Sequence, residues 1–277
     1  MENLEIQVIC AAELVDILIA EMSVLDFETF EENENGFLSF HPDPNYDIQN
    51  LQFLVEKYAS LGNVEFLSQR VEKINWNKEW ESNYSPIEIQ DKVYIRASFH
   101  PPKLAIETEI LINPQMSFGT GHHETTRLVI ELMMEENWEG QEVLDAGTGT
   151  GILAIYASLR GAKSVLGFDI DDWCVENSLE NAALNPINHF AFQQGTIKDQ
   201  KPYLYHSLIA NINRNILLQE MEEYVKFIRP GGQLYLSGFY LEDCPVIQES
   251  AESFGLNYQT HKTLNNWCAI KFIHLTT

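Results

Sequence analysis

Basic residues are scarce in this sequence. Its 277 residues include 17 lysines and arginines against 41 aspartates and glutamates, which gives a net charge of −24 at pH 7. Such an acidic surface repels phosphate groups, so we expect no direct binding of DNA, RNA or an anionic membrane. The charge suits a basic partner, while an acidity that only keeps the protein in solution is an equal alternative.

Cysteines and long apolar runs are also rare. The four cysteines (Cys10, Cys174, Cys244 and Cys268) form no Cys-x-x-Cys pair, which excludes the usual zinc-finger spacing and gives no disulfide framework. We therefore expect a reducing, cytoplasmic location. The acidic first residues predict no signal peptide. Because no run reaches 18 apolar residues, we expect no membrane-spanning helix.

Residues 1–75 are predicted to form a small α+β domain. Hydrophobic periodicity gives strands and helices in the order β-α-β-β-α-β, over residues 4–8, 11–22, 26–30, 36–41, 47–60 and 64–74. That order is typical of a ferredoxin-like fold, a common scaffold for binding protein or RNA. The domain carries 15 acidic and three basic residues, a net charge of −12. We interpret it as a receptor for a basic partner and not for RNA.

Residues 76–110 are interpreted as a connector. They include Trp76, Trp80, Tyr84, Pro101 and Pro102. Prolines interrupt regular structure, and aromatic side chains need a surface on which to pack. Because the segment lacks the Gly/Ser-rich character of a flexible tether, we expect it to be pinned onto a neighbouring domain.

Strands and helices alternate through the third segment, residues 111–277. Strands are predicted at 142–146, 164–170, 190–194, 207–211 and 233–238, with helices between them. This alternation predicts an α/β fold with a doubly wound parallel sheet covered on both faces. The last two strands, at 256–262 and 267–274, have no helix between them, so we expect an antiparallel hairpin at one sheet edge.

A glycine-rich motif, Asp145-Ala-Gly147-Thr-Gly149-Thr-Gly151, closes the first of these strands and opens a helix. Glycines let a ligand approach the backbone, and the helix N-terminus offers free N–H donors. A dinucleotide-binding motif has its third glycine one residue later. Asp145 would repel a pyrophosphate and would instead suit an amino group, such as that of a methionine moiety. A glycine-rich turn of purely structural role is the alternative.

Polar residues end two of these strands, Asp169 the second and Asn211 the fourth. A carboxylate at the first position accepts hydrogen bonds from ribose hydroxyls, so we expect an adenosine-like ligand, and the early third glycine points to S-adenosylmethionine. The fourth strand leaves the sheet beside the first, so Asn211 lies at the topological switch point, where its carbonyl can accept a hydrogen bond from a substrate amine. Helix capping is the alternative at both positions, although Asn213 is better placed to cap the helix that follows.

A polar loop precedes a helix predicted at 124–134. The loop and the first helical turn contain Phe118, Gly119, Thr120, Gly121, His122, His123, Thr125 and Thr126. Adjacent histidines rarely share one ion, and no third ligand has suitable spacing, so we expect no metal. The permissive backbone ahead of the helix resembles a lid over a bound nucleoside, while the alternative is that the hydroxyls only cap the helix.

Taken in order, these residues resemble the PrmA family, whose members methylate the lysine-rich eleventh protein of the large ribosomal subunit. The resemblance covers residues 76–277, whereas over 1–75 only the architecture agrees. It rests on the loop from Phe118 to Thr126, Asp145 to Ile155, Asp169-Ile170-Asp171, Ala210-Asn211-Ile212 and Leu236-Ser237-Gly238. The chain departs from the common family pattern at Asn113, Glu124, Thr148 and Thr150.

The resemblance implies a seven-stranded, doubly wound, Rossmann-like class I methyltransferase domain and an N-terminal ferredoxin-like domain that grips the ribosomal protein. It implies S-adenosyl-L-methionine as cofactor and N-methylation of lysine and α-amino groups. The implied cofactor residues are Thr126, Gly147, Asp169 and Asn211, with Phe118 and Gly119–Gly121 around the reacting end; the glycine-rich motif adds Asp145 and Gly149. Nothing in the sequence indicates an obligate interface, so we expect a monomer.

Methyl transfer requires alignment of a neutral amine with the methyl group, and only about one free lysine in a thousand is neutral near pH 7. Our hypothesis is that Asn211 orients the neutral amine. Three other readings remain open: amino methylation of adenine or glutamine, an NAD-dependent oxidoreductase, and a non-catalytic, S-adenosylmethionine-binding ribosome-assembly factor. Another basic protein as methyl acceptor also remains open.

Overall fold

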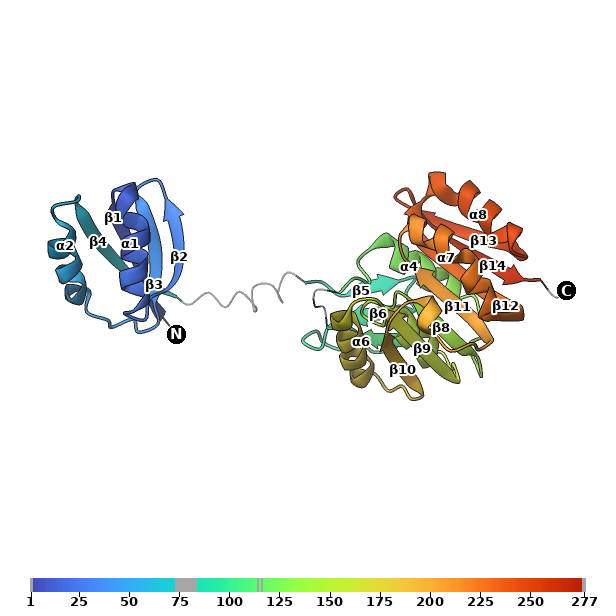
Figure 1. The fold of residues 1–277 in the computed structure, drawn as a ribbon. Helices are drawn as coiled ribbons and strands as arrows, with labels where there is room; N and C mark the ends of the chain where they lie inside the picture. The colour runs from blue at the N-terminus through green and yellow to red at the C-terminus, as the bar shows by residue number, and fades with distance from the viewer. Residues whose placement is uncertain (1, 73–83, 114, 116, 276–277) are drawn as a thin grey trace. The chain divides into compact units, whose positions relative to one another are not determined.

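The computed structural model describes residues 2–72, 84–113, 115 and 117–275. The chain forms two compact units, residues 1–83 and 84–277 (Figure 1). Among the described residues, no helix combines the length and the apolar character that crossing a bilayer requires.

The N-terminal unit is a four-stranded antiparallel sheet with the strand order β2-β3-β1-β4, which confirms the predicted ferredoxin-like fold. Two helices pack on it around one apolar core (Figure 1). Its elements are β1 (Glu2–Cys10), α1 (Ala12–Ser23), β2 (Glu28–Asn33), β3 (Gly36–His41), a 3-10 turn (Ile48–Leu51), α2 (Gln52–Tyr58) and β4 (Val64–Glu72).

Strand β2 begins later and ends later than the sequence predicted. The prediction placed a polar turn at 31–35, but β2 continues to Asn33, and only Glu34 and Asn35 lie between it and β3. Almost every side chain of β2 is exposed. Only Phe30 of this edge strand packs against the core, so its sequence lacks the alternation that marks a half-buried strand.

The second unit is built on a seven-stranded sheet with the order β10-β9-β8-β11-β12-β14-β13. The strands are β8 (Glu142–Ala146), β9 (Ser164–Asp169), β10 (Phe190–Gln194), β11 (Tyr205–Asn211), β12 (Ile228–Tyr240), β13 (Leu256–Leu264) and β14 (Trp267–His274). The first five are parallel, and β14 pairs antiparallel with both β12 and β13. The predicted doubly wound sheet, its terminal hairpin and the pairing of β8 with β11 are therefore confirmed.

Helices cover both faces of this sheet. They are α4 (Glu124–Met133), α5 (Ile152–Leu159), α6 (Asp172–Leu184), α7 (Arg214–Lys226) and α8 (Cys244–Ser253). One core gathers residues of α4, α5 and α6 around the buried Trp138 and Tyr156. A second core, on the other face, gathers residues of α7 and α8 around Leu217, Met221 and Ile247.

Residues 84–110 are not the irregular connector that the prolines predicted. The strands β5 (Ile87–Ile89), β6 (Val93–Arg96) and β7 (Thr108–Leu111) form a small sheet. Buried side chains of this sheet belong to the same core as α4 and α5. This packing agrees with the expected pinning of the segment onto a domain. Only the expected irregular backbone was wrong, because strands of three or four residues are too short to show a period of two. Trp76 and Trp80 lie outside the described residues.

Two asparagines of α6 and its C-terminus, here called the asparagine ladder, bind the free edge of β7. Asn185 accepts a hydrogen bond from the Leu111 N–H at 2.9 Å and donates one to the Leu111 carbonyl at 2.8 Å. Asn181 accepts from the Asn113 N–H at 2.9 Å and donates to the Thr150 carbonyl at 3.0 Å. Both side chains are buried. The ladder therefore satisfies backbone groups for which the sheet offers no neighbouring strand.

Replacing Asn185 with alanine should destabilise the second unit. Asn185→Ala leaves the N–H and carbonyl of Leu111 without partners in a part-buried position, which costs about 1–3 kcal/mol of unfolding free energy. Urea unfolding followed by tryptophan fluorescence measures the change. The exposed Asn257 of β13 provides a matched control, Asn257→Ala. Equal midpoints for the two variants would contradict the assignment of stability to the ladder.

Candidate functional site

A pocket of about 670 Å³ opens at the carboxyl ends of the parallel strands. It lies where β8 and β11, adjacent in the sheet, send their following helices to opposite faces. This switch point is where doubly wound sheets bind ligands, and the volume is in the range of small-molecule sites.

The pocket contains half of the residues that the sequence predicted. Phe118, Gly147, Gly149, Asp169 and Asn211 line it. Gly119, Thr120, Gly121, Thr126 and Asp145 do not line it. The pocket also includes residues that were not predicted as ligand-binding: His123, Thr125, Cys174, Trp173, Thr196, Glu220 and Trp267. Of these, Thr196 follows the third parallel strand and could have been found from its position alone.

The glycine-rich loop after β8 contacts two other segments of the site. Gly147 has φ +68°, and a Cβ atom there would lie 2.3 Å from Cγ2 of Ile212, just after β11. Gly149 has φ +56°, and a Cβ atom there would lie 2.3 Å from the carbonyl oxygen of Phe118. The Thr150 N–H donates to the same carbonyl at 3.0 Å. Only glycine fits either position, so the motif brings the backbone of three segments together.

Asp169 is placed to accept hydrogen bonds from a ligand. Its two carboxylate oxygens accept one N–H each, from Gly149 at 2.9 Å and from Asp171 at 3.2 Å. Because a carboxylate has about four acceptor positions, it keeps capacity for two further donors at the pocket wall. Asp171, the N-cap of α6, makes no side-chain cap hydrogen bond, whereas the Asp172 carboxylate accepts the Trp173 N–H at 2.8 Å. The geometry fits the predicted role of Asp169 as acceptor from ribose hydroxyls.

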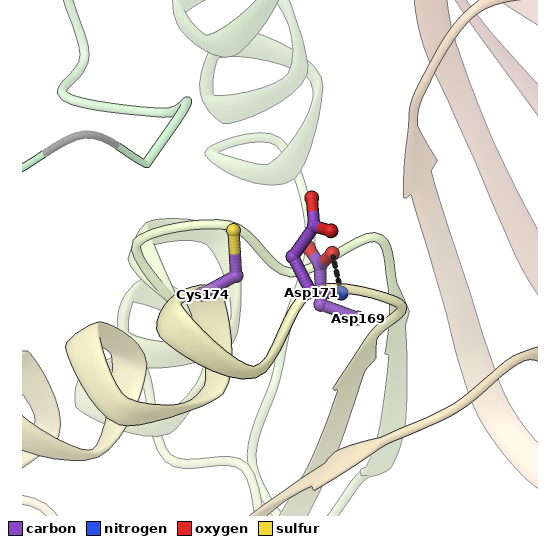
Figure 2. A group of neighbouring side chains, drawn as sticks. All are labelled: Asp169, Asp171 and Cys174. Carbon is purple, nitrogen blue, oxygen red and sulfur yellow. Dashed lines mark hydrogen bonds between the residues drawn. The ribbon is translucent and has the colours of Figure 1, made fainter.

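Asp169, Asp171 and Cys174 lie together on this wall, and their ligand atoms are all within 4.8 Å of one another (Figure 2). Burial raises the pKa of the Cys174 thiol. The two carboxylates beside it accept hydrogen bonds, so the cluster offers acceptors for the hydroxyl groups of a ligand.

Asn211 presents an unpaired acceptor at the pocket. Its Nδ2 donates to Oγ1 of the buried Thr126 at 3.5 Å, while its Oδ1 is buried and has no partner among the described residues. A buried acceptor without a donor is costly unless a ligand supplies one. Asn213 instead caps α7, because its side chain accepts from the Ile216 N–H at 3.2 Å. The expectation that Asn213 caps this helix is therefore confirmed.

The adjacent histidines are bound by different segments. His122 lies between Oγ1 of Thr120, at 3.2 Å, and the carbonyl of Ser85, at 3.0 Å. His123 is the N-cap of α4 and accepts from the Thr125 N–H at 3.3 Å. Its ring also lines the pocket. The cap of α4 is thus a histidine and not one of the threonine hydroxyls that the sequence offered as candidates.

The pocket is negative. The described residues that line it include the carboxylates of Asp169, Asp171 and Glu220 and no lysine or arginine. A cavity with this charge favours a cationic ligand and disfavours a pyrophosphate. This weakens the reading as an NAD-dependent oxidoreductase.

Asp145 lies beneath the glycine-rich loop and does not line the pocket. It accepts the Thr148 hydroxyl at 2.7 Å, and burial, the largest cause, raises the pKa of its carboxyl to about 7. The expected contact with an amino group would have to reach a side chain that is 1% exposed. The Asp145 side chain instead supports the glycine-rich loop through its hydrogen bond with Thr148.

This raised pKa makes a prediction about stability. The pKa of this carboxyl is higher in the folded chain than in the unfolded chain. Its contribution to the unfolding free energy therefore decreases as the pH rises from about 4 to about 7. Asp145→Asn removes that titration. We expect the unfolding free energy of the variant, relative to wild type, to rise by on the order of 2 kcal/mol between pH 5 and pH 8.

Urea unfolding at intervals between pH 5 and pH 8 measures this difference. Asp199→Asn is the control, because hydrogen bonds from Thr196 lower the pKa of Asp199 and keep it ionised across the whole range. A wild-type-to-variant difference that is the same at every pH would refute a titrating Asp145.

Comparison with known proteins extends these observations. The family model described as Ribosomal protein L11 methyltransferase (PrmA) matches residues 14–274. Proteins named ribosomal protein L11 methyltransferase from Porphyromonas gingivalis and Phocaeicola vulgatus are 44% and 43% identical to this chain. The alignments cover 93% and 95% of this chain and 90% and 95% of those proteins.

Solved structures agree with the fold. The ribosomal protein L11 methylase of Lactobacillus delbrueckii subsp. bulgaricus has a TM-score of 0.65 and 27% identity, covering 70% of this chain and 100% of its own. A methyltransferase from Pyrococcus furiosus, at 18% identity, shares the fold with a TM-score of 0.50 over 60% of this chain and 90% of its own. Together with the sheet order, these likenesses confirm the Rossmann-like methyltransferase fold. The chain belongs to the ribosomal protein L11 methyltransferase (PrmA) family.

Proposed function

We propose that this protein transfers methyl groups from S-adenosylmethionine to lysine and α-amino groups of ribosomal protein L11 in the cytoplasm. The observation that carries the proposal is the unpaired Oδ1 of Asn211, buried at the wall of a negative pocket at the switch point of the sheet. The identity of the substrate rests on the family, whose members bear its name.

The residues of the pocket fit S-adenosylmethionine. Asp169 has acceptor capacity for the ribose hydroxyls, and glycines at 147 and 149 allow close approach to the backbone. Ile170 and Trp173, 66% and 52% exposed, offer apolar surface for the purine beside Asp169. The carboxylates complement a positively charged sulfur. When bound, the cofactor supplies a methyl group activated on a sulfonium.

The chain's own residues bind and orient the methyl acceptor. Asn211 Oδ1 accepts an N–H of the neutral amine and so directs the nitrogen lone pair toward the methyl group. The hydrogen bond from Asn211 Nδ2 to Thr126 holds the amide in the rotation that presents Oδ1. Removal of the amine from water lowers its pKa and increases the neutral fraction, so its proton leaves to solvent before transfer.

The direct test is to incubate the purified protein with L11 and S-adenosylmethionine and to record intact masses. Mass gains in methyl-sized steps on L11 are expected. Calorimetry in parallel measures cofactor binding. Clear cofactor binding without any mass gain on L11 or on the other large-subunit proteins would contradict the proposal and favour a non-catalytic binding factor.

Asn211→Ala should separate turnover from cofactor binding. Loss of the orienting acceptor misplaces the amine, so kcat is expected to fall about 100-fold. The matched control is Asn215→Ala, an exposed asparagine whose carbonyl oxygen accepts from Arg214. Steady-state rates on L11 and calorimetry on the cofactor are compared for both variants. Full turnover by Asn211→Ala with unchanged cofactor affinity would disprove the orienting role.

Asp169→Ala should weaken the cofactor. The variant loses two hydrogen bonds to a charged acceptor, so the Kd for S-adenosylmethionine is expected to rise at least about tenfold. Asp172→Ala is the control, because Asp172 lies in the first turn of α6 and does not line the pocket. Calorimetry gives both constants. An equal Kd for the two variants would place the ribose elsewhere.

A further inference from the structure

Four aromatic side chains from three distant segments form a continuous series of ring contacts, here called the aromatic row. Phe118 and His123 have ring centroids 5.0 Å apart, and His123 and Trp267 are 4.7 Å apart in edge-to-face geometry. Trp267 and Tyr240 follow at 4.2 Å, with their planes tilted by 32°. Three of the four line the pocket, and Phe118 and Tyr240 are 53% and 43% exposed. The row therefore runs from the pocket to the surface.

Two members of the row, Trp267 and Tyr240, lie across Asn211 from Asp169, the residue assigned to the ribose. In the sheet order, β11, which ends at Asn211, stands between β9, which ends at Asp169, and the β12–β14 pair, which supplies Tyr240 and Trp267. With the adenosine on the β9 side, the β12–β14 side of the pocket is left for the methyl acceptor. Trp267 is thus part of the wall on the side left for the acceptor amine.

The surroundings of the row suit a cation. Cations are attracted to the faces of aromatic rings, most strongly to tryptophan. Glu124, next to His123, accepts a hydrogen bond at 3.1 Å from Asn265 in the turn that leads to Trp267. That hydrogen bond lowers the pKa of Glu124, so a carboxylate charge persists beside the row. No lysine or arginine is among the described residues that line the pocket.

Methylation changes what an amine can bind. Each turnover forms an N–C bond from the nitrogen lone pair as the C–S bond breaks, and the positive charge passes from sulfur to nitrogen before a proton leaves to water. Every added methyl group also replaces one N–H donor. Asn211 therefore has fewer hydrogen bonds to accept as methylation proceeds, whereas the attraction of an alkylammonium to aromatic rings persists.

We propose that the aromatic row binds the cationic alkylammonium of partly methylated substrate, and that Trp267 and Tyr240 determine how many methyl groups each amine receives. This inference rests on the proposed function and adds to it a site that retains the product of one turnover as substrate for the next.

Intact-mass time courses on L11 test this with ring-removing and ring-keeping variants. In Trp267→Leu, the rate of the later methylations relative to the first should fall about tenfold from its wild-type value; in Trp267→Phe, which keeps a ring, this ratio should lie between. Tyr240→Leu should act in the same direction. Tyr203→Leu is the matched control, because Tyr203 is 48% exposed and does not line the pocket. Equal slowing of every methylation step, or a wild type that stops at one methyl group, would overturn the inference and leave the proposed function standing.

Binding of a cation to the aromatic row can also be measured without catalysis. Nε-trimethyl-lysine and its neutral isostere, with carbon in place of the quaternary nitrogen, are titrated into the full-length protein while the indole N–H signal of Trp267 is followed by NMR, assigned with Trp267→Phe. The cation should shift this signal at lower concentration than the isostere does, and Tyr240→Leu should weaken cation binding about three- to tenfold. Equal binding of both probes would show an apolar wall without cation recognition and overturn the inference, whether or not L11 is methylated.

Discussion

Close approach of one loop to its neighbours determines where every part of the site lies. Gly147 touches the residue that follows β11, and Gly149 touches the Phe118 carbonyl, in both cases at distances that no side chain could occupy. The strand end that carries Asn211 and the loop that carries Phe118 are thus positioned by the same few atoms of backbone. Backbone packing therefore fixes the relative positions proposed for the cofactor, over this loop, and for the amine, beside Asn211.

The chain as a whole and the pocket are both negative, and both charges favour a cationic ligand. The whole chain carries a net charge of −24, a sign that favours a basic protein over nucleic acid as partner. At the pocket, carboxylates line the wall without a compensating lysine or arginine among the described residues. A sulfonium and an alkylamine are both favoured there, while the amine must give up its proton to react. In the proposed mechanism, the group that contacts the nitrogen is a neutral amide, that of Asn211.

The sequence predicts the parts of this site that depend on local patterns. The glycine-rich motif, Asp169 and Asn211 follow strand ends, and the alternation of strands with helices is enough to place those ends at one edge of a sheet. The ring contact of Trp267 with His123 could not be predicted, because Trp267 comes from a strand at the far end of the chain and no spacing links the two residues. The role of Asp145 was also inaccessible, since only the packing of the loop shows that its carboxyl is covered. The asparagine ladder lies in a helix whose polar residues look like a solvated face until the edge of β7 is placed against them.

The asparagine ladder joins β7, α6 and the glycine-rich loop entirely through amide and backbone groups, which bear no charge. Such bonds neither titrate nor weaken by Debye screening when salt is added. The acidic surface behaves in the opposite way, since its attraction for a basic partner declines within a Debye length. Ionic strength will therefore change how often this protein meets its substrate well before it changes the frame in which the methyl group is transferred.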